Sequence, residues 1–199
     1  WDATDDIFIY STKQMRQIDE QIMNKSTVPS KRKILSAVNS IYDPVGLVTP
    51  FTVKGRILMR DVWESGIGWD DPIKGELFKK WNSWLHDLQN INQIQIKRCY
   101  SSNFRNASRV ELHEFNDVSG KAYSSVAYLR ICYKIQNDEK FDVALVSSKA
   151  RVSPLKHVTI PKLETLAAVL GCRLAEIIQQ ELDVNIDQRY FLTDCQTVL

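Results

Sequence analysis

The chain has 199 residues, of which 44% are hydrophobic, so it is long enough to bury one large core or two small ones. Its 26 basic and 24 acidic residues give a formal charge of +2, which does not by itself indicate a nucleic-acid-binding protein. No apolar run approaches the roughly 20 residues that a membrane-spanning helix needs, and we therefore expect no membrane partner.

The cysteines and the first residues suggest a cellular context. The four cysteines are widely spaced without a CxxC pair, which predicts reduced, mostly buried thiols in an intracellular protein. The three histidines show no ligand spacing with them, so a zinc site is not expected. Because the chain opens on Trp1 and its first methionine is Met15, we interpret it as a piece of a longer polypeptide.

Residues 1–100 predict a mainly helical segment. After a loop at Ser26–Ser30, helical periodicity runs from Lys31 to Tyr42, and a second helix follows Pro50. Asp71 is expected to cap a third helix, with Pro72 in its first turn. Its two tryptophans, Trp81 and Trp84, could stack on bases, but their helical spacing favours a place in the core.

Residues from 105 onward predict strands followed by a helix and a further strand. The expected strands are Val110–Asp117, Ala122–Tyr133 and a third through Phe141, Val143 and Leu145, with a hairpin at Asn137-Asp138 and a loop at Ser148–Pro154. A helix starts near Pro161, and a short strand ends at Asp194. Three meander strands, a helix and a strand parallel to the first describe an α/β fold.

Three carboxylates lie at the ends of these predicted strands and at the start of the predicted helix. Asp117 ends the first strand, Glu164 lies in the first helical turn, and Asp194 closes the last strand. A parallel return strand would place Asp194 beside Asp117, and such a cluster can hold divalent cations for phosphodiester chemistry. Taken singly, a strand-end aspartate is more often a turn or cap residue, and a glutamate near a helix start more often interacts with the helix dipole.

The motifs around these carboxylates resemble one family. The strand-region motifs are FNDVSGKAYSSVAYLR at Phe115–Arg130, KARVSP at Lys149–Pro154, TIPKLE at Thr159–Glu164 and LTDCQ at Leu192–Gln196. They resemble the ribonuclease H region of Bel/Pao-type LTR retrotransposon polyproteins. The upstream motifs are KILS at Lys33–Ser36, IYDPVGLVTPF at Ile41–Phe51 and WDDP at Trp69–Pro72, and they resemble the connection between reverse transcriptase and ribonuclease H.

The resemblance implies a domain organisation and an activity. Residues 1–100 would form the helical connection segment, and residues 105–199 a ribonuclease H-like domain truncated at its C-terminus. Asp117, Glu164 and Asp194 would be three of four carboxylates that bind Mg²⁺, or alternatively Mn²⁺, for hydrolysis of the RNA strand of an RNA–DNA hybrid. The fourth carboxylate lies downstream in the family, so we expect little activity from this fragment alone.

The resemblance also implies partners and a location. The remainder of the reverse transcriptase polyprotein is one expected partner, and a cytoplasmic virus-like particle, or alternatively the nucleus, is the expected location. Basic side chains precede Glu164, and Lys149, Arg151 and Lys156 are candidates to contact the substrate backbone. An equally simple interpretation of such basic stretches is solvated surface.

The chain departs from the family pattern beside Asp117. Relatives usually carry Asp-Ala-Ser where it has Asp117-Val-Ser119, a Gly-Ala pair at Ser124-Ser125, and an apolar or cysteine residue at Asn116. These changes spare the carboxylates but add bulk or polarity next to them. Two alternatives to the enzyme therefore stay open: an inactive retroelement remnant or scaffold, and a non-catalytic nucleic-acid-binding module.

Overall fold

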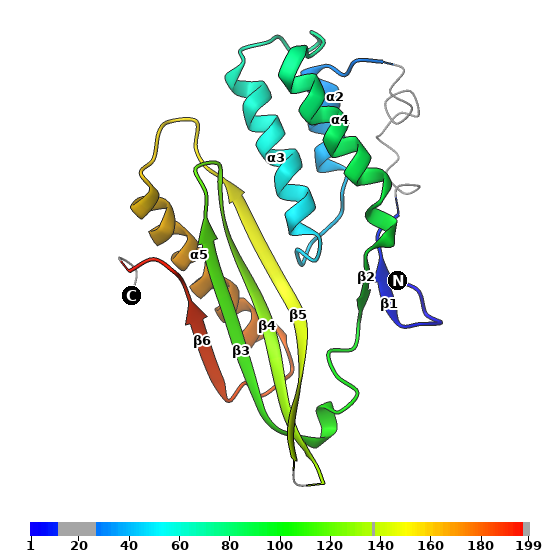
Figure 1. Ribbon diagram of the computed structural model, residues 1–199, viewed down its shortest axis with the longest axis vertical. Helices are drawn as coiled ribbons and strands as arrows, with labels where there is room; N and C mark the ends of the chain where they lie inside the picture. The colour runs from blue at the N-terminus through cyan, green and yellow to red at the C-terminus, as the bar shows by residue number, and fades with distance from the viewer. Residues whose placement is uncertain (12–26, 137, 197–199) are drawn as a thin grey trace. The chain divides into compact units, whose positions relative to one another are not determined.

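The computed structural model describes residues 1–11, 27–136 and 138–196, and it divides into two compact units (Figure 1). The first unit comprises Trp1–Pro44 and Val48–Ile96, and the second comprises Val45–Leu47 and Lys97–Leu199. Within the described ranges, no helix is both long and apolar enough to cross a membrane. The predicted hairpin position Asn137 lies outside the described residues.

Three helices build the first unit. They are α2 (Lys31–Asn39), α3 (Thr49–Glu64) and α4 (Gly75–Gln89), followed by a 3-10 turn at Ile91–Gln93. Two short strands, β1 (Ile7–Ile9) and β2 (Gln95–Lys97), pair with each other. The helix that the sequence predicts to run to Tyr42 ends three residues earlier, at Asn39.

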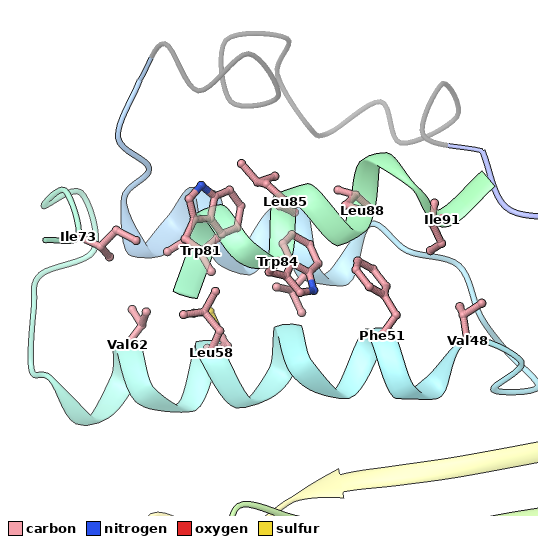
Figure 2. Packing of buried hydrophobic residues seen from close by; sticks show 14 residues of the cluster. Val48, Phe51, Leu58, Val62, Ile73, Trp81, Trp84, Leu85, Leu88 and Ile91 are labelled. Atoms are coloured by element: carbon pink, nitrogen blue, oxygen red, sulfur yellow. The ribbon is translucent and has the colours of Figure 1, made fainter. Parts of the chain in front are cut away.

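The core of this unit lies among α2, α3 and α4, and Figure 2 shows the side chains that meet there. Trp81 and Trp84 are 1% and 3% exposed, and the Trp84 ring stacks on Phe51 with 5.3 Å between centroids. The prediction that these tryptophans belong to the core is therefore confirmed. The predicted cap of α4 is wrong, because Lys74 is its N-cap and the Asp71 carboxylate instead accepts a hydrogen bond from the backbone of Gly68.

Lys31 is buried at the start of α2 between two aromatic rings. Its ammonium lies 4.4 Å from the centroid of Trp63 and 5.5 Å from that of Trp69. It also donates a hydrogen bond to the backbone carbonyl of Ile67 at 3.3 Å. A charge so enclosed is tolerable because the ring faces and the carbonyl replace part of its hydration.

The second unit contains a four-stranded mixed sheet. Its strands are β3 (Ala107–Val118), β4 (Ala122–Ile135), β5 (Asp138–Val152) and β6 (Gln188–Leu192), in the order β5-β4-β3-β6. The meander strands β3, β4 and β5 pair antiparallel, and β6 pairs parallel with β3. This is the α/β topology that the sequence predicts, with a return strand beside the first strand.

One helix, α5 (Ile160–Glu181), crosses from β5 to β6 and packs on one face of the sheet (Figure 1). Leu174, Ala175 and Ile178 meet the sheet residues Val110, Leu112 and Leu129 in one apolar cluster. A second cluster, nearer the helix start, joins Leu163, Ala167 and Leu170 to Tyr123. These contacts fix the start of α5 over the end of β3 and the start of β4.

The short segment Val45–Leu47 belongs to the second unit through contacts with β5. The Ser148 backbone N–H donates to the Val45 carbonyl at 3.0 Å, and the Ser147 hydroxyl donates to the same oxygen at 2.7 Å. The Ser148 hydroxyl donates to the Gly46 carbonyl. Both serines are buried, so these bonds replace water that the strand would otherwise need.

The cysteines are free thiols, but the prediction that most are buried is wrong. Only Cys132, on β4, is buried; Cys99 and Cys172 are exposed, and Cys195 is half-buried. Cys172 lies on the outer side of α5, because the helical period turns it away from the sheet contacts made by Gly171 and Leu174.

Candidate active site

Asp117 lies at the end of β3, where the chain turns back into β4. Its exposed carboxylate accepts a hydrogen bond from the backbone N–H of Val118 at 2.7 Å. The turn is closed by Ser119, whose backbone N–H and hydroxyl donate to the Ala122 carbonyl at 2.7 and 3.1 Å. This turn fixes the backbone around Asp117 at the edge of the sheet.

Glu164 enters the site from the start of α5. Thr159 is the N-cap and the helix begins at Ile160, so Glu164 starts the second turn rather than lying in the first, as the sequence predicts. Its neighbour Leu163 is 1% exposed and anchors this end of the helix on Tyr123. Burial of Leu163 therefore decides where the Glu164 backbone lies.

Asp194 reaches the same end of the sheet because β3 and β6 are parallel. Phe115 pairs in register with Leu192, so Asp117 and Asp194 each lie two residues beyond a matched pair. Parallel strands end on the same edge of a sheet. Asp194 is exposed, like Asp117, in the turn that follows β6.

The three carboxylates interact electrostatically. Burial raises the pKa of the Glu164 carboxyl, and the negative charges of Asp194 and Asp117 raise it further, in that order of importance. One Glu164 oxygen, Oε2, is buried and has no hydrogen-bond partner among the described residues. A buried acceptor without a donor is costly, and either a proton or a cation would relieve that cost.

The chemistry of these side chains fits a hard divalent cation. Carboxylate oxygens are the ligands that Mg²⁺ prefers, and the unpartnered Oε2 of Glu164 is such an oxygen. Over residues 1–11, 27–136 and 138–196, however, no three His, Cys, Asp or Glu side chains are already arranged to hold a metal. The carboxylate oxygens are suitable metal ligands, but the three side chains do not yet surround a common position for an ion.

Three basic residues are candidates to contact substrate: Lys149, Arg151 and Lys156. Two of them are not in a loop. β5 continues to Val152, so Lys149 and Arg151 are strand residues, and the predicted loop at Ser148–Pro154 is wrong. They pair in register with Ser125 and Tyr123 of β4, and both are exposed. Lys156 is exposed in the connection between β5 and α5.

Comparison with protein families decides the affiliation of the chain. The model of the Pao retrotransposon-like RNaseH-like domain matches residues 30–195. The chain belongs to this family. No curated protein matches it.

Membership of the Pao RNaseH-like family confirms the resemblance found in the sequence motifs. The mixed α/β architecture is consistent with an RNase H-like fold, in agreement with the predicted fold class. The matched range includes Asp117, Glu164 and Asp194, and it also includes the helices of the first unit.

A second charged cluster of the Pao RNaseH-like domain was not evident from the sequence. Glu111 is 2% exposed, and its carboxylate lies 2.8 Å from Arg109 Nε and 2.9 Å from both Arg130 Nη1 and His113 Nε2. Arg109, Glu111 and His113 alternate along β3, which a period of two could have indicated. Only the pairing of Glu111 with Arg130 across β3 and β4 completes the cluster.

Proposed function

We propose that the second unit of this Pao RNaseH-like domain binds divalent cations through Asp117, Glu164 and Asp194 and serves in hydrolysis of the RNA strand of an RNA–DNA hybrid. The observation that carries the proposal is the set of three carboxylates at the shared end of β3 and β6, two of which raise the pKa of the third. Family membership supports the reaction type.

The three carboxylates would contribute differently to cation binding. Glu164 supplies an oxygen that is buried and lacks a donor, and Asp117 and Asp194 supply exposed carboxylates that can close on an ion. Bound Mg²⁺ ions would activate the attacking water and stabilise the leaving oxygen. Like charges repel, so the ionised cluster gains from cation binding, and the same gain draws the exposed aspartates inward.

Substrate contact is proposed for Lys149, Arg151 and Lys156. Their ammonium and guanidinium groups are exposed, so they can approach phosphates without first losing a buried partner. Such contacts bind a nucleic-acid backbone without regard to base sequence. The remainder of the reverse transcriptase polyprotein would hold the hybrid on both sides of the scissile phosphate.

The test is cleavage of an RNA–DNA hybrid by the polyprotein that carries this chain, in Mg²⁺ and in Mn²⁺. Asp117→Asn keeps the shape of the side chain and removes its charge, so we expect it to lower the cleavage rate by at least about 10³-fold, the loss typical of an essential catalytic group. Asp183→Asn, in the exposed turn after α5, is the matched control and should cleave normally. Cleavage that survives Asp117→Asn would rule out the site.

Metal binding by the chain itself gives a separate measurement. Calorimetric titration with Mn²⁺ should show binding that Asp117→Asn and Glu164→Gln each weaken and that Asp183→Asn leaves unchanged. Metal binding without cleavage would support the alternative of an inactive scaffold that has kept its cation site. No difference between wild type and the site variants would exclude these carboxylates as ligands.

A further inference from the structure

A buried polar cluster separates β3 from α5 directly behind Asp117. It consists of Glu114, Asn116 and Ser125, which are 1%, 8% and 1% exposed. The Ser125 hydroxyl donates to Glu114 Oε1 at 2.6 Å, but Glu114 Oε2 and Asn116 Oδ1 are buried with no hydrogen-bond partner among the described residues. Two unpartnered acceptors in one interface call for a donor.

The helix comes unusually close to this cluster at Gly171. A Cβ built on Gly171 would lie 2.3 Å from Asn116 Oδ1 and 2.9 Å from Glu114 Oε1. The two oxygens therefore point at the same part of α5, and only the missing side chain of glycine leaves them room. The interface is too tight for Glu114 to turn toward solvent without separating the strand from the helix.

The register of the sheet brings these three polar residues together. Asn116 on β3 pairs with Ser125 on β4, and Ser125 in turn donates its hydroxyl hydrogen bond to Glu114. Three polar residues that are separate in the sequence thus form one buried cluster.

Glu111, the other buried glutamate of β3, differs from Glu114 in its charged neighbours. Both glutamates lie on β3 and both are buried, but they project from opposite faces. Burial raises the pKa of Glu111, yet hydrogen bonds from His113 and Arg130 and the charges of Arg109 and Arg130 outweigh burial and lower it overall. Glu111 is stable as an anion because cations surround it.

Around Glu114 no such cation is supplied by the paired strands or the facing helix turn. Its register partners are Ala127 on β4 and Phe191 on β6, and α5 presents Gly171. Tyr190 on β6 and Tyr128 on β4 are next to these partners in sequence, but they project from the opposite face, against His113 and Phe115. Further titratable or charged side chains on these elements include Tyr123 on β4, Arg189 on β6, Asp194 beyond β6, and Glu164, Cys172, Arg173 and Glu176 on α5. Arg189 is bound to Gln179, and Cys172, Arg173 and Glu176 are exposed on the outer side of the helix.

We propose that Glu114, Asn116 and Ser125 form a buried proton-binding cluster that holds α5 against β3 while Glu114 is neutral and loosens this contact when Glu114 ionises. Burial raises the pKa of Glu114 to about 7, although the hydrogen bond from Ser125 favours the ionised form and opposes the rise. A proton on Glu114 Oε2 turns that unpartnered acceptor into a donor, and Asn116 Oδ1 is the unpartnered acceptor in the same cluster. The cluster therefore titrates near neutral pH.

The cluster lies close in sequence to two of the site carboxylates, so its protonation affects the elements that carry them. Asn116 directly precedes Asp117, and Gly171 lies seven residues, about two helical turns, after Glu164. The contact that the proton stabilises is thus the one that holds β3 and α5, and with them two of the site carboxylates, together. This inference concerns the strand–helix contact and does not depend on the proposed catalytic activity.

The sign of the effect follows from linkage. Glu114 has a higher pKa in the folded chain than in the unfolded chain, so its contribution to stability is present below the unfolded value and is lost as pH rises through about 7. Glu114→Gln replaces the carboxyl with a neutral group of the same shape. We expect its urea midpoint to lie nearest that of wild type at about pH 4, to exceed it increasingly as pH rises to about 7, and to keep that excess at higher pH.

The control for this comparison is Glu176→Gln, an exposed glutamate on the same helix. This substitution leaves the Glu114 cluster intact, so the pH dependence of the urea midpoint that comes from Glu114 should remain. Carboxyl ¹³C chemical shifts measured by NMR should show Glu114 titrating near neutral pH. A flat difference for Glu114→Gln, or titration of Glu114 near pH 4.5, would overturn the proposal.

Ser125→Ala provides a second test if Glu114→Gln does not fold. Loss of the Ser125 hydroxyl removes the hydrogen bond that favours the ionised form, so the NMR titration of Glu114 should move to higher pH. Ser124→Ala, at the neighbouring position on β4, is the matched control and should leave the Glu114 titration unchanged. A downward shift or no shift in Ser125→Ala would contradict the cluster.

Discussion

Glu164 is the least exposed of the three carboxylates at the shared end of β3 and β6. Its neighbour on α5, Leu163, is anchored in the core, which holds the helix backbone at this position. At this scale the properties of the site come from where single charges lie and how much water reaches them. Burial and like charges act in the same direction on the Glu164 pKa.

Asp117→Asn should lower the pKa of Glu164. The substitution removes one of the two negative charges that disfavour Glu164 ionisation, while burial and Asp194 continue to raise the pKa. Carboxyl ¹³C NMR of Glu164 from about pH 3 to about pH 8, roughly the span over which carboxyls titrate in folded proteins, measures the change. Asp183→Asn should leave the titration in place, and an unchanged Glu164 titration in Asp117→Asn would mean that the two groups do not interact.

Gly171→Ala should destabilise the second unit even though alanine favours helices. The added methyl group would meet Asn116 and Glu114 in a buried interface, which we expect to cost about 1–3 kcal/mol of unfolding free energy, more than the roughly 1 kcal/mol gained in helix propensity. Urea denaturation measures the difference. Gly120→Ala, where the new group meets nothing within 4 Å, is the control.

A second substitution identifies the cause of that loss. Asn116→Ala removes the oxygen nearest the new methyl group, so the pair Gly171→Ala and Asn116→Ala should lose less than the sum of the single losses. Strict additivity would mean that the destabilisation arises elsewhere along α5.

At the scale of elements, a few specific contacts in the first unit join its helices in addition to apolar packing. In the first unit, Lys31 at the start of α2 lies against Trp63 near the end of α3 and Trp69 in the following connection. The Trp63 and Trp69 rings meet edge to face with 5.2 Å between centroids. A single ammonium thus holds two elements and a connecting segment together.

Lys31→Met should destabilise the first unit by about 1–2 kcal/mol. Methionine keeps the apolar stem but loses the cation–π contacts and the hydrogen bond to Ile67. Chemical denaturation followed by tryptophan fluorescence is a suitable measurement, because Trp63 and Trp69 report on the site. Lys33→Met, an exposed position two residues later, should change stability by less than about 0.5 kcal/mol; equal losses in the two variants would exclude a special role for Lys31.

For the whole molecule, the formal charge of +2 conceals an uneven distribution of charge. Residues 149–162 carry four basic side chains and no acid, and the three proposed substrate contacts belong to this stretch. Nucleic-acid binding through such a stretch depends on counterion release and therefore on salt. Net charge alone would not predict that dependence.

Replacing Lys149, Arg151 and Lys156 by glutamine should weaken binding of an RNA–DNA hybrid and reduce its salt dependence. Each lost phosphate contact lowers the slope of log K against log salt by about 0.9 at most, as for B-form DNA. Fluorescence anisotropy at several salt concentrations measures both quantities. Lys134→Gln with Lys140→Gln, exposed at the opposite end of the β4–β5 hairpin, is the control, and equal slopes in the two variants would exclude the proposed surface.

Local sequence patterns predicted most elements but placed several boundaries wrongly. Leu163, Ala167, Leu170 and Leu174 keep helical spacing, so α5 was predictable. Lys149 and Arg151 were predicted in a loop because the polar and small side chains of Ser148–Pro154 resemble one, yet β5 continues to Val152 because its backbone pairs with β4. Asp71 and Pro72 form a pattern typical of a helix start, although α4 begins only at Gly75.

The sequence by itself determined the element types, the buried faces of the helices and the three candidate carboxylates with their family. These depend on periodicity and on motifs that are contiguous in the chain. Only the tertiary structure decided that Glu111 has cationic neighbours while Glu114 faces Gly171 and Ser125, because register and the approach of α5 set those distances. Burial and charge act through space, so two glutamates three residues apart on one strand acquire opposite pKa shifts.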